Sequence, residues 1–66
     1  MKGTVKRWIT GRGYGFIETD QGNRDIFVHF SEVENGEILY EGQRVEFDLE
    51  PSDQGPRAIN VRLIEE

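Results

Sequence analysis

The sequence has no cysteine, only one histidine and two prolines, and no long hydrophobic run among its 66 residues. Without cysteine there are no disulfide bonds, thiolate zinc ligands or cysteine nucleophile, which fits a reducing compartment. No run of 18 apolar residues is present, and the stretch 1–4 is polar rather than the apolar core of a signal peptide. We therefore expect a cytoplasmic protein that is neither secreted nor embedded in a membrane.

Length and the scarcity of catalytic residue types restrict the function further. A chain this short buries only about 60% of the surface exposed by its unfolded form, which favours one domain over residues 1–66 and disfavours a large active-site cleft. The only histidine, His29, has no recognisable catalytic or metal-ligating partners in the sequence. We expect no enzyme activity, no metal, no cofactor and no small-molecule substrate.

Charge is unevenly distributed along the chain. The net charge is −5, but residues 1–30 carry five Lys or Arg against three carboxylates, while residues 31–66 carry three against ten. The positive half also contains most of the aromatic residues. Basic and aromatic side chains are thus interleaved as a base-stacking surface requires, and the acidic half is expected to limit non-specific association.

Turn-forming residues occur at short intervals and predict strands rather than helices. Period-two alternation is clearest around residues 14–19 and 43–50. Residues 30–42 lose this alternation, which predicts a turn or short helical turn followed by an irregular loop. The expected strands are 3–9, 14–19, 25–29, 43–50 and a fifth strand carrying Ile59, Val61 and Leu63. Five short strands favour a closed or nearly closed all-β barrel, because closure removes exposed sheet edges.

The aliphatic residues of these strands suffice for a core and leave several aromatic rings unassigned. The predicted core is Val5, Ile17, Ile26, Val28, Val45, Phe47, Leu49, Ile59, Val61 and Leu63. If the aliphatic residues face inward, the pleat turns the alternating rings of strands 14–19 and 25–29 outward onto one surface. So much exposed apolar area in a small protein usually marks a binding site.

Unpaired nucleobases are the ligands that such a surface fits best, because stacking on aromatic rings depends little on base identity. Nearby Lys and Arg side chains are expected to hold phosphates. For two rings packing remains the alternative: Phe30 lies at a strand end, and Trp8 divides evenly between packing and ligand contact. The candidate binding residues are Lys6, Arg7, Trp8, Arg12, Tyr14, Phe16, Phe27, His29 and Phe30.

Two short motifs resemble the signatures of the cold-shock domain family. Residues 12–17 read Arg-Gly-Tyr-Gly-Phe-Ile, and residues 26–30 read Ile-Phe-Val-His-Phe. Gly42 and the stretch 55–58 are also similar to the family, so the resemblance covers nearly the whole chain. It implies a five-stranded antiparallel Greek-key barrel of the OB-fold type. It also implies binding of single-stranded RNA or DNA, as an RNA chaperone or cold-responsive protein.

The chain departs from the family pattern in three places. Arg7 stands where the family usually has a stacking Trp, and Ile9 replaces the usual Asn. A guanidinium also stacks on bases and pairs with phosphate, so this subsite is expected to persist in altered form. The loop 34–40 is about two residues shorter than in common bacterial members and lacks their Phe, with Tyr40 as a weak substitute. The short loop and acidic balance are more similar to archaeal members.

Two alternatives remain open at the level of sequence. The aromatic patch is also suited to a protein or peptide partner, and salt dependence distinguishes the two, because phosphate contacts weaken steeply with salt. The carboxylates Glu46, Asp48 and Glu50 share one strand face as a cation site would require, but a solvated face is favoured in the absence of an Asp-rich loop. We expect a monomer.

Overall fold

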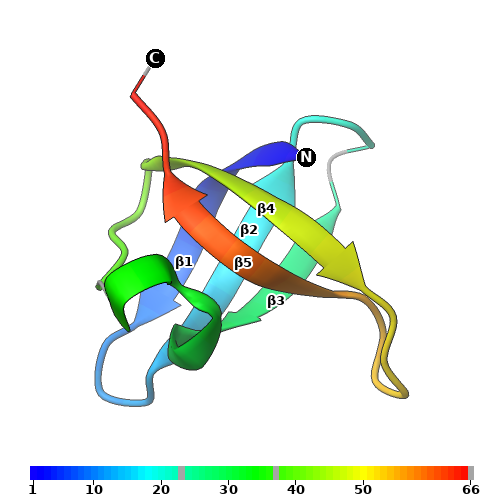
Figure 1. Ribbon diagram of the computed structural model, residues 1–66, viewed down its shortest axis with the longest axis horizontal. Coiled ribbons are helices and arrows are strands. Elements are labelled where there is room, and N and C mark those ends of the chain that lie inside the picture. The colour runs from blue at the N-terminus through cyan, green and yellow to red at the C-terminus, as the bar shows by residue number, and fades with distance from the viewer. Residues whose placement is uncertain (23, 37, 66) are drawn as a thin grey trace.

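Five strands form the molecule, which we describe from a computed structural model for residues 1–22, 24–36 and 38–65 (Figure 1). The strands are β1 (Lys2–Ile9), β2 (Tyr14–Thr19), β3 (Asp25–His29), β4 (Arg44–Glu50) and β5 (Arg57–Leu63). Two 3-10 turns, η1 (Phe30–Glu32) and η2 (Glu34–Gly36), lie between β3 and β4, where a short helical turn was predicted. Within the described part of the chain, no helix is long and apolar enough to cross a membrane.

The strands close into a barrel in the order β1-β2-β3-β5-β4, with β4 returning to pair with β1. In Figure 1, β4 and β5 cross in front of the layer formed by β1, β2 and β3. The predicted all-β, five-stranded barrel is confirmed. One pairing differs from the antiparallel expectation, because β3 and β5 run parallel to each other.

The barrel interior contains seven of the predicted core residues and three that were not predicted. Val33 and Leu39 reach it from the segment between β3 and β4, and Ala58 reaches it from β5. The first two escaped prediction because that segment has no strand periodicity to mark an inward face. The buried core is Val5, Ile17, Ile26, Val28, Val33, Leu39, Val45, Phe47, Ala58 and Val61.

The prediction that Leu49, Ile59 and Leu63 fill the core was wrong. Leu49 and Leu63 are 40% and 39% exposed, and Ile59 is only half-buried. The period-two pattern read from the sequence therefore does not hold in β5, whereas in β4 Leu49 keeps its place opposite the buried Ala58 but is exposed near the strand end.

A β-bulge in β5 interrupts the pattern there. Glu46 lies opposite Arg62, but two residues further along β4 Asp48 lies opposite Ile59, so β5 carries one extra residue. Asn60 sits in this bulge with a φ of 53°, a left-handed conformation that Asn tolerates better than most residues. The bulge reverses the pleat, and the buried positions of β5 fall three residues apart instead of two.

Candidate nucleic-acid interface

Five aromatic side chains gather where β2 and β3 pair. The rings of Tyr14, Phe16 and Phe27 form one mutual cluster, with centroid separations of 5.6 to 6.3 Å. His29 and Phe30 form a second pair 4.7 Å apart at the end of β3. Tyr14 lies opposite His29 across the strand pair, which links the two groups. We call this surface the ring platform, defined as Tyr14, Phe16, Phe27, His29 and Phe30.

The pleat separates the ring platform from the core as predicted. Ile17 and Val28 have 0% exposure, whereas Phe27 is 36% and Phe30 is 49% exposed. The remaining rings of the platform are half-buried, with neighbouring rings covering part of their surface. Neither Phe16 nor Phe27 belongs to the buried core, so the alternative that these rings fill the barrel is excluded.

A second bulge lies in β1 and determines which β1 side chains share the face of the ring platform. Val5 lies opposite Ile17 and Arg7 lies opposite Phe16, so Lys6 is the extra residue. Directly opposed residues of an antiparallel pair project from the same face. Arg7 therefore shares the outward face with Phe16, in the position where sequence comparison suggested that it replaces a stacking ring.

Trp8 follows Arg7 and consequently faces the other way. It lies opposite Gly15, is half-buried and packs against the core. A Cβ at Gly15 would come within 2.7 Å of the indole Cε3 and 2.3 Å of the Arg7 carbonyl oxygen, so only glycine fits beneath the indole. The geometry thus favours packing for Trp8, the residue that the sequence divided evenly between two roles.

One row of cross-strand neighbours runs over four strands of the barrel. Arg7 opposes Phe16, Phe16 opposes Phe27, and Phe27 opposes Arg57 across the parallel β3–β5 pair. A guanidinium group therefore stands at each end of a pair of rings. Arg57 was not among the predicted site residues, because the sequence alone does not reveal that β5 pairs with β3.

The predicted phosphate-binding cations differ in whether a carboxylate already pairs with them. The Lys6 ammonium lies 3.3 Å from both carboxylate oxygens of Asp25. Arg7 and Arg12 are exposed and form no ion pair within the described residues. An incoming phosphate would have to compete with Asp25 for Lys6, whereas Arg7 and Arg12 are immediately accessible.

Local hydrogen bonds orient the rings at the end of β3. The backbone N–H of Ser31 lies 3.2 Å from Nδ1 of His29 and the Ser31 hydroxyl lies 2.8 Å from the same nitrogen, so Ser31 orients the imidazole ring. The Phe30 N–H donates to the Gly13 carbonyl oxygen at 2.8 Å. A Cβ at Gly13 would lie 2.9 Å from the Phe30 ring, and Gly13 has a φ of 74°, so glycine is needed there on both counts.

A cleft borders the ring platform on the β5 side. It has a volume of about 470 Å³ and is lined by Phe16, Phe27 and residues 52–57 of the β4–β5 loop and the start of β5. The shortened loop 34–40, by contrast, supplies no ring to the platform in the described residues: Tyr40 is exposed, but it makes no aromatic contact there.

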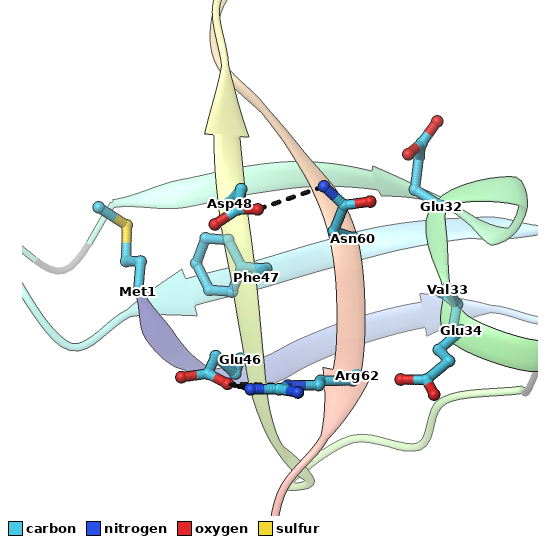
Figure 2. Close-up of a pocket in the computed structure, with 9 residues that line it drawn as sticks. All are labelled: Met1, Glu32, Val33, Glu34, Glu46, Phe47, Asp48, Asn60 and Arg62. Atoms are coloured by element: carbon cyan, nitrogen blue, oxygen red, sulfur yellow. Dashed lines mark hydrogen bonds and ion pairs between the residues drawn. The ribbon is translucent and has the colours of Figure 1, made fainter.

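An acidic pocket of about 630 Å³ lies on another face, over β4 and β5 (Figure 2). Figure 2 shows Glu46 paired with Arg62, and Asp48 accepting a 3.2 Å hydrogen bond from Asn60. The hydrogen bond from Arg62 lowers the pKa of Glu46 below its usual range. The lining residues are Met1, Glu32, Val33, Glu34, Glu46, Phe47, Asp48, Asn60 and Arg62.

The carboxylates of β4 thus have cross-strand partners that the sequence did not suggest. Glu50 pairs with Arg57 in the same way as Glu46 pairs with Arg62. Within the described residues, no group of His, Cys, Asp or Glu is arranged to hold a metal ion. Arginine side chains accompany Glu46 and Glu50, and Asn60 accompanies Asp48.

Comparison with known proteins identifies the family of this chain. Residues 1–64 match the model of the "Cold-shock" DNA-binding domain. The chain belongs to the cold-shock domain family. It is 46% identical over 68 residues to the cold shock-like protein of Aquifex aeolicus, covering 100% of this chain and 97% of that protein. It is also 46% identical over 66 residues to cold shock-like protein CspC of Escherichia coli, covering 97% and 96% respectively.

Solved structures show the same fold. The Drosophila Unr CSD456 structure superposes with a TM-score of 0.81 at 23% sequence identity, over 97% of this chain and 26% of that longer chain. This similarity concerns the fold alone. With the family match, it confirms the predicted cold-shock barrel of the OB-fold type and places the chain in a nucleic-acid-binding family.

Proposed function

We propose that the protein binds single-stranded RNA or DNA by stacking unpaired bases on the ring platform. Lys6, Arg7 and Arg12 contact the phosphates, and Trp8 supports the sheet under the platform by packing against Gly15 and the core. Each stacked base contributes on the order of 1–3 kcal/mol, largely independent of its identity. Binding is therefore expected to be general for unpaired strands rather than restricted to one sequence.

The observation that supports this proposal most strongly is the outward placement of the rings beside accessible cations. Phe16 and Phe27 lie outside the buried core, and the exposed Arg7 stands opposite Phe16 in the same cross-strand row. Rings supply stacking surface and guanidinium groups supply phosphate contacts, which together are the two requirements for single-strand binding. A peptide partner would use the rings but would not require accessible cations beside them.

The same proposal includes the wider biological role. By occupying unpaired segments the protein shifts RNA away from hairpins through mass action, as an RNA chaperone does, without catalysing a reaction. We propose a single cytoplasmic domain over residues 1–66 that acts as a monomer and needs no cofactor.

The test is a fluorescence-anisotropy titration of labelled oligo-U, oligo-dT and duplex DNA at two salt concentrations. Binding to the single strands should weaken with salt, with a logarithmic slope of about −0.7 for each phosphate contacted, or about −2 for three cations. Duplex binding should be much weaker at physiological salt. A flat salt dependence would favour a peptide-binding surface instead, and nanomolar affinity for duplex DNA would contradict the proposal.

A further inference from the structure

Arg57 occupies a position that the proposed stacking surface does not yet use. It begins β5, lies opposite Phe27 across the parallel strand pair, and lines the cleft of about 470 Å³ that also contacts Phe16. A base stacked on Phe27 would therefore present one edge towards Arg57.

The ion pair with Glu50 fixes how the guanidinium group is presented. Both Nε and Nη2 of Arg57 donate to Oε1 of Glu50, the former at 2.8 Å. This contact occupies the Nε side of the planar group. Nη1 and the second proton of Nη2 make no hydrogen bond within the described part of the chain, and both side chains are more than 40% exposed. The end of the guanidinium group that faces away from Glu50 therefore carries two parallel N–H donors, one on Nη1 and one on Nη2.

We propose that Arg57, held by Glu50, recognises guanine in the cleft beside Phe27. Two parallel arginine donors match the O6 and N7 acceptors of guanine, a common specific contact of arginine with a base. Adenine offers N7 but places an amino group where guanine has O6, and pyrimidines have no N7. In a duplex this edge is reached only through the major groove, whereas in a single strand it is directly accessible to Arg57.

This inference depends on the proposed single-strand binding and adds a base preference to it. Stacking alone predicts similar affinities for all bases, whereas a bidentate contact discriminates by about 5-fold to 150-fold against the wrong base. Glu50 is a positioning residue in this scheme, because it restricts the guanidinium rotamer without contacting the base.

The experiment compares oligo-U strands that carry one central guanine, adenine or 7-deazaguanine, with the affinity for each measured by anisotropy. The guanine strand should bind about 5-fold or more tightly than the adenine strand. The 7-deazaguanine strand, which keeps O6 but lacks N7, should lose most of that preference. Equal affinities for guanine and adenine strands would overturn the inference while leaving single-strand binding intact; failure of every strand to bind would overturn both.

Variants of two similar ion pairs provide the matched control. R57K keeps the positive charge but removes the two parallel N–H donors, so the ratio of the affinities for the guanine and adenine strands should fall to about one. E50Q should lower the ratio partly. R62K alters the equivalent arginine of the Arg62–Glu46 pair, which has the same donor pattern on the acidic face, and should leave the ratio unchanged.

These variants also separate base recognition from phosphate binding. If R57K weakens guanine and adenine strands by the same factor, Arg57 contacts phosphate and the inference is wrong. Thermal unfolding of R57K, E50Q and R62K checks that each barrel remains folded, so that a change in the ratio reflects recognition. A ratio unchanged in R57K would likewise overturn the assignment.

Discussion

The ring platform and the acidic pocket are built on the same small barrel but present opposite chemistry. The platform combines five aromatic rings with accessible Arg7 and Arg12, whereas the pocket of Figure 2 combines four carboxylates with Arg62, already paired with Glu46. The net charge of −5 describes neither surface. The distribution of charge over faces, rather than its sum, therefore determines whether a polyanion is attracted.

Each surface depends on a single inserted residue in one strand. The β1 bulge at Lys6 turns Arg7 towards the rings, and the β5 bulge at Asn60 sets which residues of β5 are buried. Because side chains alternate along a strand, one extra residue exchanges the two faces for everything beyond it. The contrast between the two surfaces is therefore fixed by backbone irregularities as much as by side-chain identity.

Removing one ring should produce the largest difference between the two surfaces. Phe27→Ala should weaken oligo-U binding by roughly 1–3 kcal/mol, because a stacking surface is lost while the core residues stay in place. Leu63→Ala removes a side chain of similar exposure beside the acidic pocket and should leave affinity unchanged. Anisotropy titrations measure both affinities. Equal losses for the two variants would show that binding does not distinguish these faces.

Phe16→Ala is expected to behave like Phe27→Ala, since both rings belong to the same cross-strand pair. Thermal unfolding provides the check on structure. If either variant loses its cooperative unfolding transition, that ring contributes to the core, and its assignment to the interface is wrong.

Neutralising one accessible cation should have a smaller effect. Arg7→Gln removes one phosphate contact, so the logarithmic salt slope for oligo-U should become shallower by about 0.7 and affinity should fall a few-fold. Arg62→Gln makes the same change of charge on the acidic side and should leave the slope unaltered. An identical change of slope in both variants would mean that long-range net charge, rather than local contact, governs binding.

The sequence predicted the ring face well because that part of the chain follows regular rules. Period-two alternation holds without interruption in β2 and β3, so the outward rings and the inward Ile17 and Val28 were correctly separated. The glycine-rich turn before Tyr14 and the polar turn after Thr19 also bound β2 as predicted.

Strand β5 was predicted less well, because its irregularity and its pairing leave little trace in the sequence. Nothing in residues 59–63 marks Asn60 as a bulge, so Ile59 and Leu63 were assigned to the core. Arg57 was missed because its place beside Phe27 depends on a pairing between strands far apart in the chain. Local patterns predict which residues share a strand face, but only the closed barrel determines which strands become neighbours.

Changing a carboxylate of the acidic pocket should have almost no effect on binding. Glu46→Gln removes the charge partner of Arg62, on a face that the proposed strand path does not cross. Affinity for oligo-U should stay within about twofold, because exposed charges beyond a Debye length of about 10 Å at 0.1 M salt are largely screened. A large loss of affinity would show that the interface has been assigned to the wrong face.

The smallest expected effect concerns the stability of the fold in acid. The hydrogen bond from Arg62 lowers the pKa of Glu46, and that from Arg44 lowers the pKa of Asp20. A carboxyl group with a lower pKa in the folded state stabilises the fold above its unfolded pKa, and this contribution is lost as the pH falls through the folded value. Stability should therefore decline below roughly pH 4.

The decline should be shallower in Glu46→Gln, as followed by thermal unfolding. If the variant and the original protein lose stability in parallel, the Glu46–Arg62 pair contributes nothing to folding, since exposed pairs often contribute little.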